Sequence, residues 1–176
     1  MSKTPENAVF LPINIAVLTV SDTRTEETDT SGRYLVEQLQ GAGHQLAEKA
    51  ILPDDIYLMR ALISRWIADA GVQAIIITGG TGMTGRDVTP EAIRPLFDKD
   101  IEGFGELFRM LSYDDIQTST VQSRALAGLA NATLIFGIPG STGACTLAWE
   151  QILSAQLDSR TKPCPFITLL PRLKEK

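Results

Sequence analysis

The sequence contains few of the residues from which most catalytic and metal sites are built. Its 176 residues include one histidine and two cysteines. His44 lies in a glycine-rich turn ahead of an expected strand, and a lone histidine argues against a Ser-His-Asp triad and against a histidine-rich metal site. Cys145 and Cys164 have no metal-ligand spacing, so we expect both to be buried or incidental thiols.

Basic residues do not outnumber acidic ones, and long apolar runs are lacking. The net charge of −5 argues against general nucleic-acid binding, which depends on an excess of Lys and Arg. No apolar run approaches the roughly 18 residues of a membrane span. The polar residues 1–10 lack the apolar core of a signal peptide. We therefore expect a cytoplasmic protein that binds neither nucleic acid nor membranes.

Length and composition predict one globular domain. A chain of 176 residues can bury a full core, and its 44% hydrophobic and 21% charged residues are ordinary for such a domain. We expect a single domain over residues 1–176, with a core at about 13–157 and peripheral termini. The proline-rich tail 162–176 is expected to be irregular and peripheral.

Strand and helix patterns alternate along the chain. Buried-strand patterns lie at 13–20, 45–52, 74–78 and 132–138. Helical patterns lie at 31–40, 55–70, 90–97, 103–111 and 143–157. Strands separated by helices predict right-handed crossovers. The expected fold is therefore α/β with three layers, a mainly parallel sheet with helices on both faces.

Residues 74–91 carry the most informative pattern, a buried strand that runs into a glycine-dense turn and then a helix start. The turn contains four glycines, at positions 79, 80, 82 and 85. They allow the backbone to approach an anion closely, so that amide groups can bind phosphate. Thr89 and Pro90 fit the N-cap and first position of the next helix. Asp87 lies outside that cap, and we expect its carboxylate to be free for chemistry.

This turn is similar in part to two named phosphate-binding motifs, the dinucleotide fingerprint and the Walker loop. Residues 80–85 match the dinucleotide fingerprint GxGxxG, but that motif normally follows the first strand and has an acid at the end of the next strand. Here the turn follows the third expected strand, which leaves a nicotinamide oxidoreductase as a distant alternative. A Walker loop is excluded, because Arg86 and Asp87 stand where that motif needs Lys and then Ser or Thr.

Three expected loops leave the carboxyl edge of the sheet, where ligands of such folds bind. They span 21–32, 79–87 and 138–142, and each offers hydroxyl, glycine or acidic residues that can contact phosphate oxygens or a metal. A fourth acidic site at 53–55 follows the second strand. Arg86 or Arg124 could add positive charge for an anionic substrate.

Several of these residues have structural alternatives. Asp54 could cap the helix at 55–70 instead of taking part in catalysis. Asp22 could form an Asx turn. Other caps could come from Asp29, Thr30 or Ser31 in the first helix and from Ser141 or Thr142 in the last. Capping at the last helix does not compete with anion binding there. A purely structural role is least expected for Asp87.

A series of motifs resembles the MoaB/MogA family of molybdenum cofactor biosynthesis proteins. In order they are LTVSD (18–22), DTSG (29–32), PD (53–54), TGGTG (78–82), RDVTPE (86–91), GFGE (103–106), LAG (126–128) and PG (139–140). The resemblance spans about residues 13–157. The stretches SRALAGLA (123–130) and WEQI (149–152) are most similar to the bacterial protein B branch.

The resemblance implies a protein that forms a trimer or a pair of trimers and adenylylates molybdopterin. In that reaction the terminal phosphate of molybdopterin attacks the α-phosphorus of Mg-ATP and releases pyrophosphate. No protein nucleophile or histidine base is needed, because the attacking phosphate is already deprotonated.

Family roles carry over to matching positions as expectations. Asp87 and Asp54 are the expected catalytic residues, and Asp87 is expected to help hold Mg²⁺ on ATP. The expected nucleotide and substrate contacts are Ser21, Asp22, Asp29, Gly32, Gly79, Gly80, Thr81, Gly82, Pro139, Gly140 and Ser141. Some protein B relatives are silent and have a changed carboxylate loop, whereas here both acidic motifs are intact. The alternative is a non-catalytic molybdopterin-binding or carrier protein.

Overall fold

One six-stranded sheet organises the part of the chain, residues 9–173 and 175, that the computed structural model describes. Its strands are β1 (Asn14–Val20), β2 (Gln45–Leu52), β3 (Ala74–Thr78), β4 (Lys99–Asp100), β5 (Leu126–Ala130) and β6 (Thr133–Ile138). They are ordered β2-β1-β3-β6-β5-β4, with the first four parallel and β5 antiparallel to both of its neighbours.

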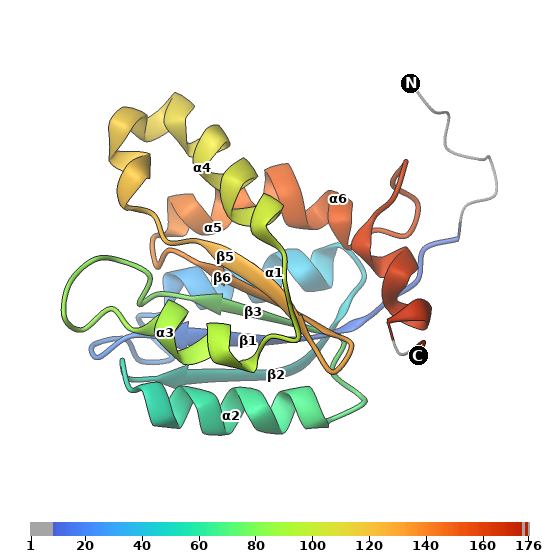
Figure 1. Cartoon of the computed structure of the whole chain (residues 1–176), viewed down its shortest axis with the longest axis horizontal. Helices are drawn as coiled ribbons and strands as arrows, with labels where there is room; N and C mark the ends of the chain where they lie inside the picture. The colour runs from blue at the N-terminus through green and yellow to red at the C-terminus, as the bar shows by residue number, and fades with distance from the viewer. Residues whose placement is uncertain (1–8, 174, 176) are drawn as a thin grey trace.

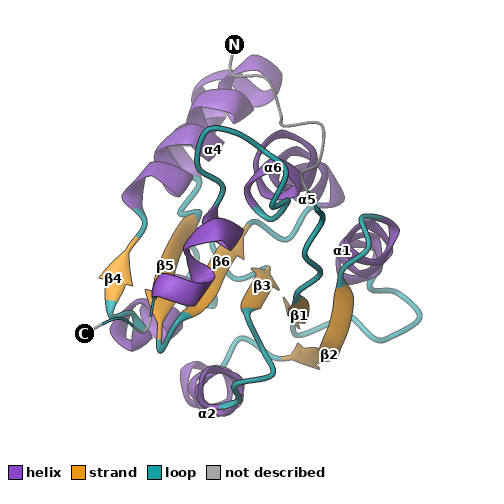
Figure 2. Cartoon of the chain, turned by 90° about the vertical axis from the view of Figure 1, so that its right-hand side faces the viewer, coloured by secondary structure: helices purple, strands orange, loops and turns teal. Residues whose placement is uncertain are grey.

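Helices cover both faces of this sheet (Figure 1). On one face pack α1 (Thr30–Gly41), α4 (Glu102–Ile116) and α5 (Thr142–Ala148), and on the other α2 (Ile56–Ala68) and α3 (Thr89–Ile93) (Figure 2). Alternate side chains of strand β1 explain why both faces are covered. Ile15 and Val17 pack with α1, α4 and α5 in the first core cluster, and Ala16 and Leu18 pack with α2 and α3 in the second. The three-layer α/β fold expected from the sequence is confirmed.

Three helices continue into other helical turns. Helix α3 is followed by η1 (Arg94–Leu96), and α4 by η2 (Gln117–Gln122). Helix α5 passes through a π-helical segment, η3 (Trp149–Leu153), into α6 (Ser154–Gln156). The helical patterns expected at 90–97 and 143–157 therefore correspond to composite helices.

The antiparallel part of the sheet was not predicted. Strands β5 and β6 are joined by Asn131 and Ala132, which both have positive φ, 45° and 66°. Such a turn usually carries glycine, and an alanine there hides the hairpin in the sequence. Strand β4 is two residues long and too short for a periodic signal.

The expectation that the tail is irregular and peripheral was wrong in part. Residues Phe166–Arg172 form the 3-10 helix η4, and Ile167 is buried in the first core cluster. Lys174 and Lys176 lie outside the described residues.

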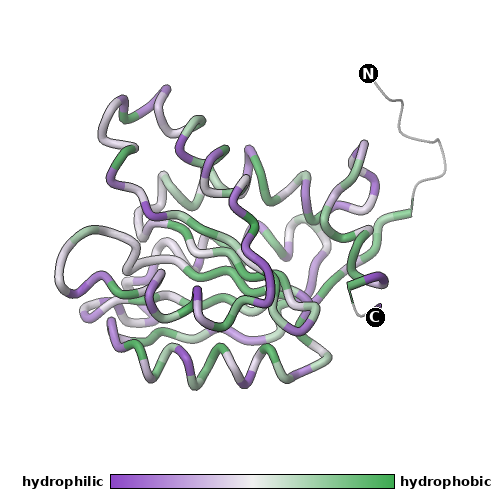
Figure 3. Tube along the Cα trace, viewed as in Figure 1, coloured by the Kyte–Doolittle hydropathy of each residue, from purple (hydrophilic) through white to green (hydrophobic). Residues whose placement is uncertain are grey.

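The hydropathy of the trace separates core from loops. The central strands are the most hydrophobic part, while the loops that leave their carboxyl ends are white to purple (Figure 3). No helix within the described residues is long and apolar enough to cross a membrane.

Candidate functional site

The loops at the carboxyl ends of β1, β3 and β6 surround one pocket of about 550 Å³. Of the expected site residues, Ser21, Asp29, Gly79, Gly80, Thr81, Gly82, Asp87, Pro139 and Gly140 line it. Ser119 and Gln122 of η2 also line it. Neither was predicted, because polar side chains in a short 3-10 turn have no distinctive sequence pattern.

The glycine loop depends on backbone conformations that other residues resist. Gly79 and Gly80 have φ of +105° and +63°. A β-carbon at Gly79 would lie 2.1 Å from the carbonyl oxygen of Val20, and one at Gly80 would lie 2.4 Å from Oγ1 of Thr89. The amide of Gly79 donates to the carbonyl of Ile138 at 3.0 Å, which ties the loop to β6.

The predicted capping role of Thr89 is wrong. Val88 occupies the N-cap position of α3, and Thr89 is the first helical residue. Its hydroxyl donates to the carbonyl oxygen of Gly79 at 2.8 Å, and its amide donates to the carbonyl of Gly80 at 2.9 Å. Thr89 is therefore the first residue of α3 and fixes the glycine loop, and it does not act as the helix cap.

The sequence predicted a free carboxylate at Asp87; the side chain lines the pocket, but one of its oxygens is engaged by Thr84. Its Oδ2 accepts hydrogen bonds from the amide and the hydroxyl of Thr84, at 2.9 and 2.6 Å. The Thr84 hydroxyl bond is the main reason that the pKa of Asp87 lies below its ordinary value. The side chain is thus held as a carboxylate, the form that binds a cation.

Asp54 does not cap α2, because Asp55 does. Oδ1 of Asp55 accepts from the amides of Tyr57 and Leu58 at 2.8 and 2.9 Å. Oδ1 of Asp54 is buried and, among the described residues, has no hydrogen-bond partner. Burial raises the pKa of Asp54, and the negative charges of Asp22 and Asp87 raise it further. A buried carboxylate oxygen that lacks a donor is a fit place for a cation or a proton.

Asp22 links the first loop to the glycine loop. Its carboxylate accepts two bonds from Nη2 of Arg86, at 2.6 and 2.7 Å, and one from Nε at 2.9 Å. Oδ1 also accepts from the amide of Asp54 at 3.3 Å. The bond to Arg86 lowers the pKa of Asp22. The local turn considered for Asp22 is made by Ser21, whose Oγ accepts from the amides of Thr23 and Arg24, both at 3.2 Å.

Asp29 is buried, with 1% of its surface exposed, and its carboxylate is fully engaged. It caps α1 through the amide of Gly32 at 2.8 Å, accepts from the hydroxyl of Thr19 at 2.9 Å and pairs with Lys49 at 2.9 Å. A β-carbon at Gly32 would lie 2.2 Å from Oδ2 of Asp29. These contacts favour a positioning role for Asp29 and Gly32 over the ligand contact expected.

Lys49 is a residue that sequence reasoning missed. It lies on β2 and also pairs with Glu26 of the first loop at 2.6 Å. A single lysine within a strand gives no sequence signal, and the partnership appears when β2 pairs with β1.

The third loop is fixed from both sides. Ser141 caps α5 by accepting from the amide of Ala144 at 3.1 Å, as the sequence allowed. The carbonyl of Gly140 accepts from the hydroxyl of Ser31 at 2.9 Å, and that of Pro139 from Thr78 at 3.1 Å. Ser141 lines a neighbouring cavity of about 320 Å³, which shares Ile116, Ser123 and Pro139 with the pocket of about 550 Å³.

Comparison with known proteins gives the chain close relatives. Residues 16–159 match the family described as "Probable molybdopterin binding domain". The chain is 59% identical over 157 residues to molybdenum cofactor biosynthesis protein B of Escherichia coli strain K12, which covers 89% of this chain and 92% of the relative. It is 44% identical over 146 residues to the protein of that name in Bacillus subtilis strain 168, covering 82% and 86%.

Solved structures show the same fold. A crystal structure of molybdenum cofactor biosynthesis protein B is 42% identical and matches with a TM-score of 0.81, covering 84% of this chain and 92% of the other. The tungsten cofactor synthesizing protein MoaB from Pyrococcus furiosus is 34% identical and matches with a TM-score of 0.75, covering 93% and 98%.

Proposed function

We propose, from the premise that this chain belongs to the molybdenum cofactor biosynthesis protein B family, that its pocket catalyses the Mg-ATP-dependent adenylylation of molybdopterin. The family gives the chain a role in molybdenum cofactor biosynthesis. The reaction would be a nucleotidyl transfer with ATP and molybdopterin as its substrates.

The observation that carries the proposal is the pair of carboxylates at the glycine loop. Oδ1 of Asp54 has no hydrogen-bond partner among the described residues, and the charge of Asp87 helps to raise the pKa of Asp54. An oxygen donor set of this kind fits Mg²⁺, which takes one or two carboxylates and completes its shell with waters and substrate phosphates. No group of three or more His, Cys, Asp or Glu side chains that could hold a metal ion occurs in the described part of the chain.

The reaction depends mainly on holding the two substrates in line, because no protein side chain has to react with them. A terminal phosphate oxygen of molybdopterin forms a bond to the α-phosphorus of ATP, and the bond from that phosphorus to pyrophosphate breaks with its electron pair on the leaving group. Mg²⁺ would offset the repulsion between the two anions. Gly79, Gly80, Thr81 and Gly82 would hold the ATP phosphates, while Asp87 and Asp54 would hold the cation.

The neighbouring cavity supports a place for the pterin ring. It is lined by the apolar side chains of Phe108 and Leu147 and by the carboxylates of Asp115 and Glu150. A pterin edge presents adjacent N–H donors that a carboxylate accepts. The loop 139–141 would then serve the pterin side of the groove, and the glycine loop the adenylate side.

A homotrimer or hexamer is part of the proposal. Met110 and Val121, on the arm formed by α4 and η2, are 63% and 80% exposed, which supports a surface covered in an assembly. Light scattering on the purified chain tests this, and a monomer at micromolar concentration would contradict it.

Product formation tests the reaction. Purified protein is mixed with molybdopterin, ATP and Mg²⁺, and adenylyl-molybdopterin and pyrophosphate are measured by chromatography for the parent, Asp87→Asn and a control, Asp114→Asn, at an exposed carboxylate outside the pocket. We expect product from the parent and the control but not from Asp87→Asn. Tight pterin binding without adenylate would instead make the chain a carrier.

A further inference from the structure

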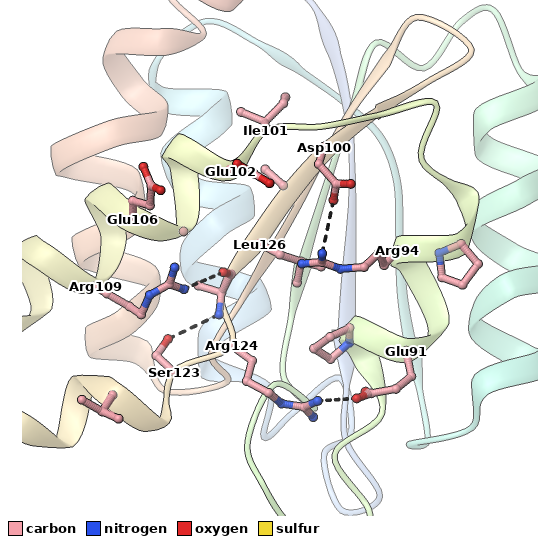
Figure 4. Close-up of a pocket in the computed structure, with 16 residues that line it drawn as sticks. Glu91, Arg94, Asp100, Ile101, Glu102, Glu106, Arg109, Ser123, Arg124 and Leu126 are labelled. Atoms are coloured by element: carbon pink, nitrogen blue, oxygen red, sulfur yellow. Dashed lines mark hydrogen bonds and ion pairs between the residues drawn. The ribbon is translucent and has the colours of Figure 1, made fainter.

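Arg124 binds the main chain of the glycine loop at both ends of its exposed part. It lies between η2 and β5, and its side chain is 27% exposed. Nε donates to the carbonyl oxygen of Gly82 and Nη2 to that of Asp87, each at 2.8 Å. Nη1 pairs with Glu91 of α3, as Figure 4 shows. The sequence had offered Arg124 as a contact for an anion, but its three nitrogens are directed at these oxygens.

One planar group therefore sets the distance between the two ends of the segment 82–87. A guanidinium has a rigid fork of donors, so it can hold two carbonyl oxygens at a fixed separation. Within the segment, the amide of Asp87 donates to the carbonyl of Thr84 at 3.1 Å, and Oδ2 of Asp87 accepts the two bonds from Thr84. The segment thus holds the Asp87 side chain, and Arg124 holds the segment.

We infer that Arg124 is a positioning residue that places the Asp87 carboxylate for the cation-assisted step. It acts through the carbonyls of Gly82 and Asp87 and touches no reacting atom. Its effect on turnover rests on the proposed adenylyl transfer, whereas its effect on the loop does not. Lysine cannot replace it, because one ammonium lacks the fork that spans both carbonyls.

Arg109 is a matched control in the same surroundings. Both arginines line a cavity of about 1040 Å³ between α3 and α4 (Figure 4). Arg109 donates to the carbonyl oxygen of Ala125 at 3.2 Å, and within the described part of the chain it makes no hydrogen bond to the glycine loop. Replacing it removes the same charge from the same cavity and leaves the loop contacts in place.

The experiment compares Arg124→Ala, Arg124→Lys and Arg109→Ala in the full chain. Amide hydrogen exchange is followed in peptides that cover residues 82–89, and adenylate formation is measured against ATP and Mg²⁺ concentration. We expect exchange in the loop to rise about tenfold in Arg124→Ala and less in Arg124→Lys, with no rise in Arg109→Ala. We expect kcat to fall by about 10–100-fold in Arg124→Ala, with a higher Mg²⁺ requirement and a smaller change in KM for ATP.

The two arms separate failure of this inference from failure of the proposed function. A parent that forms no adenylate refutes the transferase, and loop exchange then decides the role of Arg124 alone. Equal loop exchange in Arg124→Ala and Arg109→Ala overturns the inference. So does equal turnover in these two variants when the parent is active. If Arg124→Ala does not fold, the same comparison of loop exchange and turnover is made between Arg124→Lys and Arg109→Ala, and equal values would again overturn the inference.

Discussion

Oδ1 of Asp54 lies against the glycine loop, so closely that a β-carbon at Gly80 would fall 2.6 Å from it. This oxygen is buried, and no donor among the described residues reaches it. Gly80 therefore serves two purposes, since it takes a positive φ and leaves room for an acid beside the loop. A free carboxylate in this place disfavours the folded state and is retained where function needs it.

Asp54→Asn should stabilise the protein at neutral pH. The folded pKa of Asp54 is raised by burial and then by Asp22 and Asp87. A raised folded pKa means that this carboxyl favours folding below its unfolded pKa, and that the contribution is lost as pH rises through the folded pKa. We expect Asp54→Asn to raise Tm at pH 7 by about 2–4 °C, equivalent to about 1 kcal/mol, and to lose this advantage near pH 3.

The neighbouring residue supplies the control, because Asp55 caps α2. Asp55→Ala should lower stability by about 1 kcal/mol at pH 7. Thermal unfolding of both variants checks the opposite signs. A lower Tm for Asp54→Asn at pH 7 would show that its carboxylate has a stabilising partner in solution.

The glycines of the loop should divide into strict and tolerant positions. Gly79→Ala places a β-carbon against the main chain at a positive φ, so we expect a loss of roughly 2–4 kcal/mol and of ligand binding. Gly80→Ala should lower stability less but remove activity, since its new carbon meets two side-chain atoms, Oγ1 of Thr89 and Oδ1 of Asp54, and not the main chain. Gly85 has open space at its β-carbon position, and Gly85→Ala is the control. Urea unfolding together with a nucleotide-binding assay measures both effects, and equal behaviour of the three variants would contradict the loop geometry.

The pair of Asp29 and Lys49 should contribute stability that acid removes. Burial alone would raise the pKa of Asp29, but hydrogen bonds from Lys49, Gly32 and Thr19 outweigh it and lower that pKa. A lowered folded pKa means that the contribution is present above the unfolded pKa and is lost as pH falls through the folded pKa. We expect Asp29→Asn to cost about 2 kcal/mol at pH 7, because Lys49 loses its buried partner and keeps the exposed Glu26.

The difference between Asp29→Asn and the parent should narrow as pH falls below 3.8, the ordinary pKa of the carboxyl. Asp100→Asn, which breaks a more exposed pair with Arg94 at 3.7 Å, should cost less than about 1 kcal/mol. Denaturant unfolding over a pH series measures each difference. A constant difference between pH 7 and pH 3 would mean that the effect does not come from the charge.

The sequence predicted the three layers because a strand that is buried on both faces of a sheet appears as a continuous apolar run, which is easy to recognise. The run Ala74–Thr78 is buried along its whole length, and such a run fits a central parallel strand. The sequence did not predict β5, because the turn that follows it has two residues of positive φ, and one of them is an alanine where a glycine is usual. Hairpins and short edge strands depend on such local backbone choices, which periodicity does not reveal.

The candidate site shows a similar division. Glycines and acids at strand ends predicted Asp54 and Asp87, and the structure places Asp54 beside Gly80 and Asp87 in the pocket, because a parallel sheet brings those ends together. Their catalytic role stays a prediction. Side chains that act through the main chain or through another residue were missed or misassigned. The helix cap considered for Asp54 is made by Asp55, and the hydroxyl of Thr89 bonds to the glycine loop. Lys49 and Arg124 contact residues that are far away in the sequence, which a local pattern cannot reveal.

Arg86 should matter for ligand binding and for acid titration but little for stability. Its side chain is 66% exposed and that of its partner Asp22 is 39% exposed, so their pair should contribute less than about 1 kcal/mol. The positive charge of Arg86 lowers the pKa of Asp54 and so opposes burial and the charges of Asp22 and Asp87, which raise it.

In Arg86→Gln that positive charge is gone, so the pKa of Asp54 should rise further. The acid limb of the pH–rate profile for adenylate formation should then move to higher pH, and KM for ATP should rise about tenfold because a triphosphate meets three aspartates without the arginine. Arg33→Gln removes an exposed arginine that donates to loop carbonyls at Glu26 and Glu27, and it should leave both quantities unchanged. An acid limb that stays in place in Arg86→Gln would exclude Asp54 as the group that sets it.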